Sequence, residues 1–230
     1  MPYPFAHPAA VLPLARLMGP LAVPSALAIG SIVPDLWYFV PLATRDQSHG
    51  IPALLWFCLP LGAAAYFLFH LLLKQPLIAL LSPRLGAFAC AGLPRVPAYA
   101  VAASLVAGAL THIAWDSLVH YPQPPWLQHA STALGTAVLA GWIWHKVRTA
   151  RVPAAALRLS PVVRMSVVLA ALGVMAAVAA CTADVAPALD RGTLRHLLRT
   201  AGIAGLQGFG AALLCYCALW QLRARRATSA

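Results

Sequence analysis

The segment THIAWDSLVH places three ionisable side chains at helical spacing, namely His112, Asp116 and His120. On an α-helix, residues four apart differ by only about 40° around the axis and lie about 6 Å apart, so the three side chains share one stripe. A His–Asp pair that fastens two helices would need only two such groups. Three groups on one stripe therefore favour a metal-binding or proton-handling role over a structural fastener.

Imidazole nitrogens and carboxylate oxygens together suit Zn²⁺ or a similar divalent ion. Such an ion lowers the pKa of a bound water and polarises the bond to be cleaved, while a spare Asp or His transfers the proton. We therefore interpret Asp116 and His120 as candidate catalytic residues of a hydrolase. His112 and His120 lie about 12 Å apart along a helix. They therefore either bind two different metal ions, or one of them hydrogen-bonds to a ligand residue without binding the metal itself.

The composition indicates that these residues belong to a membrane protein. Of 230 residues, 61% are hydrophobic and 9% are charged, whereas about a quarter of the residues in soluble domains are charged. A bilayer solvates apolar side chains on the outside of a helix bundle, which removes the need for a polar exterior. We therefore predict an all-α, polytopic transmembrane helix bundle.

Five segments reach or approach the roughly 20 apolar residues needed to cross a hydrocarbon layer of about 30 Å. They cover residues 51–73, 97–120, 129–146, 163–183 and 200–222. We expect about five spanning helices at these positions, preceded by shorter helices.

The first part of the chain contains apolar segments that are too short to span a membrane. Residues 7–18 would form a helix only about 17 Å long, and Gly19 separates them from the similarly short segment 21–33. We prefer a hairpin of two half-length helices packed inside the bundle. The alternative is one kinked span over residues 21–43, which would contain Asp35.

These elements can bring further ligand-type residues to the stripe that carries His112. If the first two spanning segments are antiparallel neighbours, His49 in the SHG motif lies beside the end of the second one. In the hairpin arrangement, His7 begins the first half-length helix and Asp35 follows the second, so both emerge on the same side. Five or six ligand-type residues then converge on one site.

The other histidines are not expected to join this site. His70 is about 30 Å from His49 along a continuous helix, so it belongs to the opposite interface. His129, His145 and His196 lie at segment ends or in loops. We interpret these three as solvated or interfacial residues.

The net charge of +11 could indicate a nucleic-acid partner, but the basic residues lie between the apolar segments, without a binding motif. Most of them fall in the linkers 74–96 and 147–162 and in the tail after Gln221, which the charge bias places in the cytoplasm. The loop 44–50 then lies outside; the loop 184–199 fits less well because it carries three arginines. We expect a cytoplasmic C-terminus, an outward-facing site and no nucleic-acid partner.

Four motifs in the first 125 residues resemble a bacterial membrane family. They are MPYPFAHPAAVLPL at the start, IGSIVPDLWYF around Asp35, SHG at His49, and HIAWDSLVH at the end of the second span. Their order and spacing resemble the uncharacterised integral-membrane family called domain of unknown function 4184. The resemblance implies a family-like region over residues 1–125 that carries the His/Asp cluster, and a location in the bacterial inner membrane. For residues 126–230 we expect C-terminal transmembrane helices from their hydrophobic composition alone.

The same motifs resemble, more distantly, membrane-bound metal-dependent hydrolases and zinc-dependent phospholipases C. This resemblance implies a divalent metal, with Zn²⁺ as the first candidate. The chain lacks the downstream HxxxE of the phospholipase pattern because it contains no Glu, which leaves open whether His120 fills part of that role. The ligands implied by position are His7, Asp35, His49, His112 and Asp116.

Two functional hypotheses follow from these residues. The first is a membrane-embedded metal-dependent hydrolase that acts on an ester, phosphoester or amide near the lipid headgroups. The second is a non-enzymatic membrane protein whose His/Asp cluster is a structural network or a proton or metal-ion relay. A sealed and fully hydrogen-bonded cluster would favour the second, whereas an open coordination position would favour the first. Transport is a weaker alternative, because the sequence contains no convincing inverted repeat.

Overall fold

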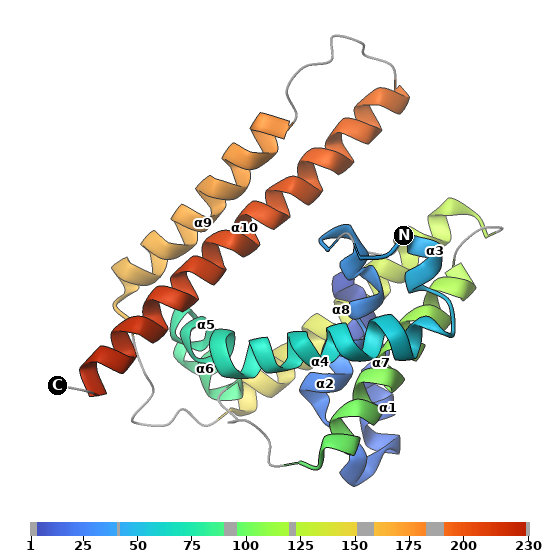
Figure 1. The fold of residues 1–230 in the computed structure, drawn as a ribbon, viewed down its shortest axis with the longest axis horizontal. Helices are drawn as coiled ribbons and strands as arrows, with labels where there is room; N and C mark the ends of the chain where they lie inside the picture. The colour runs from blue at the N-terminus through green and yellow to red at the C-terminus, as the bar shows by residue number, and fades with distance from the viewer. Residues whose placement is uncertain are drawn as a thin grey trace. The chain divides into compact units, whose positions relative to one another are not determined.

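The computed structural model describes residues 4–40, 42–89, 96–119, 123–150, 159–182 and 191–228 (Figure 1). Helices and short turns make up this part of the chain, with no strand among the residues described, so the predicted all-α fold is confirmed. The chain divides into two compact units. The first combines Met1–Leu71 with Ala91–Arg151, and the second combines Leu72–Cys90 with Val152–Ala230.

Four helices in the described ranges are long and apolar enough to cross a membrane. They are Leu54–Leu80, Ala98–Val119, Pro161–Thr182 and Thr200–Arg223, with lengths of 22 to 27 residues. At 1.5 Å per residue, each exceeds the hydrocarbon thickness of about 30 Å. These helices indicate a multi-pass membrane protein.

The fifth predicted span, residues 129–146, lies within helix α8 (Pro125–Thr149). This helix has 25 residues, but it is not among the helices apolar enough to count as candidate spans. Its first turns carry Gln128 and His129, and its last turn carries Lys146 and Arg148. The structure therefore supports four candidate spans in the described ranges, because α8 has the length of a span without its apolar composition.

Short helical elements form the N-terminal region, and the hairpin of two half-length helices stays a prediction. The segments are η1 (Pro4–Ala9), α1 (Val11–Leu17), η2 (Gly19–Leu21), α2 (Pro24–Gly30) and η3 (Val33–Tyr38). Gly19 has a φ of 53°, a left-handed conformation that glycine adopts without steric cost. Helix α2 ends at Gly30 and η3 begins at Val33, so residues 21–40 do not form one continuous helix.

Helix α2 packs against α7 (Ala98–Val119) through two glycines. A Cβ atom on Gly30 would collide with the backbone oxygen of Leu105, and one on Gly108 would collide with the backbone oxygen of Leu27. Small residues at such a crossing allow two helix backbones to approach closely. The position of α2 on α7 is therefore set by direct backbone contact.

A serine of α7 also holds the start of α2. The hydroxyl of Ser104 accepts a hydrogen bond from the Val23 amide at 2.9 Å and donates one to the Leu21 carbonyl at 3.2 Å. Ser104 is fully buried. Its hydroxyl satisfies backbone groups that the short helix cannot pair internally, which stabilises this helix end inside the unit.

The helix Leu54–Leu80 contains wide π-type turns at η4 (Leu54–Cys58) and η5 (Phe69–Leu73), which flank α4 (Leu59–Leu68) and precede α5 (Lys74–Leu80). Its first turns pack in a buried apolar cluster that joins η3, η4 and α7. The members include Val33, Phe57, Cys58 and Ala109. This cluster holds η3 beside α7, which is the arrangement that the site requires.

The second unit contains α5, α6 (Pro83–Ala89), α9 (Pro161–Thr182) and α10 (Arg191–Thr228). Helices α9 and α10 lie side by side (Figure 1). At Gly208 of α10, an added Cβ would lie 2.9 Å from the Val178 side chain of α9. Tyr216 of α10 donates a hydrogen bond to the Pro76 carbonyl of α5 at 3.1 Å. None of the residues described below for the candidate site belongs to this unit.

Candidate metal centre

Five side chains from four parts of the first unit meet at one place. His7 lies in η1, Asp35 in η3, His49 directly after α3 (Arg45–Ser48), and His112 and Asp116 one turn apart in α7. Their side chains are between 0% and 9% exposed. The residues selected from the sequence as ligands therefore converge, although they come from segments more than 100 residues apart.

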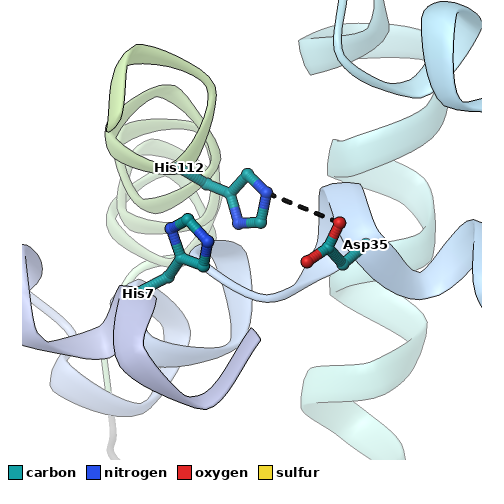
Figure 2. A group of neighbouring side chains, drawn as sticks. All are labelled: His7, Asp35 and His112. Carbon is teal, nitrogen blue, oxygen red and sulfur yellow. Dashed lines mark ion pairs between the residues drawn. The ribbon is translucent and has the colours of Figure 1, made fainter. Parts of the chain in front are cut away.

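The two carboxylates lie among the three imidazoles. Asp116 Oδ1 is 3.7 Å from His7 Nε2, and Asp116 Oδ2 is 3.6 Å from His49 Nε2 and 4.0 Å from His112 Nε2. Asp35 Oδ1 is 3.5 Å from His49 Nε2 and 3.7 Å from His112 Nε2. Figure 2 shows His112 directed toward Asp35, with the ring of His7 beside it at a centroid separation of 3.7 Å.

A backbone carbonyl sets the orientation of His112. Its Nδ1 lies 2.7 Å from the carbonyl oxygen of Ser31, the residue that follows α2. A carbonyl can only accept, so Nδ1 carries the proton and donates it. In the neutral ring, Nε2 is then an unprotonated nitrogen, and it faces Asp35 and Asp116. The close approach of α2 to α7 makes this orienting contact possible.

His49 is oriented in the same way by its own helix. Its Nδ1 lies 3.1 Å from the Arg45 carbonyl oxygen and 2.9 Å from the Ser48 hydroxyl. The Ser48 hydroxyl itself donates to the Arg45 carbonyl at 3.0 Å, so it accepts from the ring. The proton again lies on Nδ1, and Nε2 faces Asp35 and Asp116.

The short helix α3 is stabilised by a capping box. The Thr44 hydroxyl accepts from the Gln47 amide at 3.4 Å, and the Gln47 side-chain oxygen accepts from the Thr44 amide at 2.9 Å. These paired contacts satisfy two backbone donors at the helix start. The sequence TRDQSH thus contains the local signals that fix His49 at the end of a single helical turn.

The distances in the cluster fit a bound ion better than direct pairing. The five imidazole–carboxylate separations given above are 3.5 Å to 4.0 Å, longer than the roughly 2.7–2.9 Å of charge-assisted hydrogen bonds. Bonds of about 2.0–2.1 Å to a tetrahedral zinc ion place neighbouring ligand atoms about 3.3 Å apart. The donor atoms are therefore close enough together that subsets of them could hold a metal ion.

Three of these donor atoms are buried and have no hydrogen-bond partner among the described residues. They are Asp35 Oδ1, His49 Nε2 and His112 Nε2. Buried polar atoms in folded proteins are nearly always paired, so these three atoms are available to bind an ion. Two overlapping groups of ligand atoms, each within 4.8 Å, could hold a metal ion. The groups are His7, Asp35 and His112, and His49, His112 and Asp116.

The charge state of Asp35 suits this role. Burial alone would raise the pKa of Asp35, but the neighbouring imidazoles of His49, His112 and His7, when protonated, bring it below its ordinary value. Asp35 lies outside the four candidate spans. The ionised carboxyl group is the form that could bind a metal ion.

Arg45 is a neighbour of the cluster that the sequence reasoning did not select. Its Nη2 atom lies 3.5 Å from Asp116 Oδ2, and its side chain is 35% exposed. The sequence did carry a signal for it, because Arg45 lies one helical turn before His49 in a segment with a capping-box pattern. Because the side chain of Arg45 is long and flexible, its direction depends on tertiary contacts that the sequence does not specify.

The remaining histidines that the structure describes lie outside the two metal-ligand groups. His70 lies 2.9 Å from the Ser25 hydroxyl through its Nε2 atom and belongs to neither metal-ligand group. His129 and His145 are exposed in α8. His120, the second candidate catalytic residue, lies outside the described residues, and the side chain of His196 is not described either. The role assigned to His120 stays a prediction.

Comparison with known proteins identifies a family but no characterised relative. No curated protein and no solved structure matches the chain, so the resemblance to hydrolases rests on the motif residues alone. A family model described as a domain of unknown function, DUF4184, matches residues 1–124, which is more than half of the 230-residue chain and includes all five cluster residues. The chain therefore belongs to the DUF4184 family.

Proposed function

We propose that this protein is a membrane-embedded, metal-dependent hydrolase that cleaves an ester, phosphoester or amide bond near the lipid headgroups. The observation that carries the proposal is the matched orientation of His112 and His49. Both rings donate through Nδ1 to a backbone carbonyl and turn Nε2 toward the same two carboxylates. Imidazole ligands of metal ions are oriented in this way in general.

The ligands of the ion would come from the five residues of the cluster. Their mixture of imidazole nitrogens and carboxylate oxygens makes Zn²⁺ the first candidate. When bound, such an ion would lower the pKa of a water molecule and polarise the scissile bond. Asp116 is the candidate to take up a proton, because its two oxygens face different neighbours and one can bind while the other accepts. His120 is the second candidate for proton transfer.

The exposure of the surrounding side chains supports access from one side. His7, Asp35, His112 and Asp116 are between 0% and 5% exposed, whereas His49 is 9% and Arg45 is 35% exposed. Substrate would therefore approach the cluster past α3, which lies in the loop 44–50. In the topology that the charge bias favours, this loop faces outward from a bacterial inner membrane and the C-terminus is cytoplasmic. The substrate would be a lipid or a group linked to a headgroup.

The alternative hypothesis of a structural or relay network is less well supported. A structural network in a buried site should have its polar atoms hydrogen-bonded, but Asp35 Oδ1, His49 Nε2 and His112 Nε2 have no such partner among the described residues. A proton relay requires a continuous chain of hydrogen bonds, and the imidazole–carboxylate distances exceed hydrogen-bond length. Both observations favour an ion at the centre.

Metal content tests the proposal directly. Protein purified without chelators should contain roughly one or more Zn²⁺ per chain by inductively coupled plasma mass spectrometry, and the Asp116→Ala variant should lose it. Asp46→Ala is the matched control, because Asp46 is an exposed acid on α3. If the purified protein holds no metal even after attempted reloading, the hydrolase proposal is wrong. Metal that binds only when Asp116 is present would justify a screen of ester and phosphoester substrates.

A further inference from the structure

The geometry points to Arg45 as the residue that binds an anionic, oxygen-bearing group of the substrate, a phosphoryl or a carboxylate group, beside the metal centre. This inference rests on the proposed function and deepens it, because it names a chemical property of the substrate. Among the described residues, Arg45 both contacts the buried cluster and is partly exposed. Its guanidinium group lies 3.5 Å from Asp116, and its side chain is 35% exposed.

The hydrogen-bonding capacity of Arg45 is largely unused. A guanidinium group has five N–H donors in a planar fork that matches phosphate and carboxylate oxygens. The one hydrogen bond described for this side chain is the 3.5 Å contact with Asp116 Oδ2. This length is well beyond the roughly 2.7–2.9 Å of a strong charge-assisted bond. The remaining donors are available to a ligand that enters past α3.

A bound metal ion would make the net charge of the site more positive, which favours binding of an anion. Without a metal, Arg45 partly neutralises Asp116, which is the structural role that competes with this inference. With a divalent ion, the charges of Asp35 and Asp116 are balanced by the ion, and the guanidinium group leaves a net positive charge at the opening. A site of this kind attracts a group that carries negative oxygens.

Local structure holds Arg45 in a defined position relative to the ligands. Its own carbonyl oxygen accepts from the Ser48 hydroxyl and lies 3.1 Å from His49 Nδ1. The capping box of Thr44 and Gln47 stabilises the same helical turn. One residue therefore orients a candidate ligand through its backbone and presents a cation beside the cluster through its side chain.

Anion binding to the full-length, metal-loaded protein in detergent tests the inference. Inorganic phosphate and acetate would be titrated separately by isothermal titration calorimetry, and metal content would be measured in every sample. We expect at least one of the two anions to bind, and Arg45→Gln to weaken its affinity by roughly 10-fold or more. Arg45→Lys should weaken it less, because it keeps the charge but loses the fork. Arg16→Gln should bind like the wild type, because Arg16 is exposed and makes no ion pair among those described.

The outcomes separate the two proposals. Phosphate binding that depends on Arg45 assigns a phosphoryl group, and acetate binding that depends on Arg45 assigns a carboxylate. If the metal-loaded wild type binds neither anion, or if Arg45→Gln binds both as tightly as the wild type, Arg45 has no such role while the metal proposal stands. If Arg45→Gln loses its metal, metal-loaded Arg45→Lys decides: a weaker anion affinity supports binding through the guanidinium fork, and wild-type affinity for both anions overturns it. A wild type without metal overturns the proposed function itself.

Discussion

The two compact units of this chain use helices in different ways. The first packs short, interrupted elements against the longer α7 and buries polar side chains from both, including His7, Asp35 and His112. The second contains the uninterrupted helices α9 and α10, and only 6% of the most apolar stretch of α9 is buried. An apolar helix pairs its backbone groups internally, so its exposed side chains can face lipid without further protein contacts. The interruptions in the first unit are what allow backbone carbonyls, such as that of Ser31, to orient side chains in the interior.

The largest expected effect concerns the cluster itself. His112→Ala should weaken Zn²⁺ binding by about 100-fold or more, because even residues that only support metal ligands contribute about 10–100-fold. His70→Ala is the matched control, because His70 is a half-buried histidine of the same unit that contacts Ser25. Metal affinity would be measured by competition with a chromogenic chelator. Equal losses in both variants would show that metal binding depends on general folding, which would break the distinction between the cluster and its surroundings.

The next effect compares a glycine from each unit. Gly108→Ala should destabilise the protein by about 1–3 kcal/mol, because its Cβ would collide with the backbone of α2. Gly173→Ala in α9 has open space around the new methyl group, so its effect should stay within about 0.5 kcal/mol. Thermal unfolding in detergent measures both. Similar melting temperatures for the two variants would contradict the close packing of α2 on α7.

The smallest effect compares two hydroxyl groups. Ser104→Ala should cost about 1–2 kcal/mol, because the buried Val23 amide loses its partner. Thr182→Ala in α9 removes only contacts of an exposed hydroxyl with carbonyls of its own helix, so little change is expected. The same unfolding assay applies, and Ser104→Ala should also lower the protection of the Val23 amide from hydrogen exchange. Wild-type stability in Ser104→Ala would contradict the anchoring role of this hydroxyl.

Much of the candidate site could be predicted from residue spacing. His112 and Asp116 are one turn apart on a helix, and that relation holds in any fold that keeps α7 helical. His7, Asp35 and His49 joined the same predicted site through two assumptions. These were a hairpin of the short N-terminal helices and an antiparallel arrangement of the first two spans. The count of five spans was less accurate, because the apolar stretch in α8 is flanked by polar residues within the same helix.

The sequence by itself determined the membrane class, the short N-terminal helices and the set of ligand-type residues, because composition and helical periodicity are local properties. Only the tertiary structure decided which ring nitrogen of His112 and His49 faces the carboxylates, since that depends on the carbonyl groups of Ser31 and Arg45. It also decided that the Arg45 side chain reaches Asp116, which is 71 residues away in the chain. The orientation of a side chain depends on neighbours that are distant in sequence, and residue spacing carries no information about them.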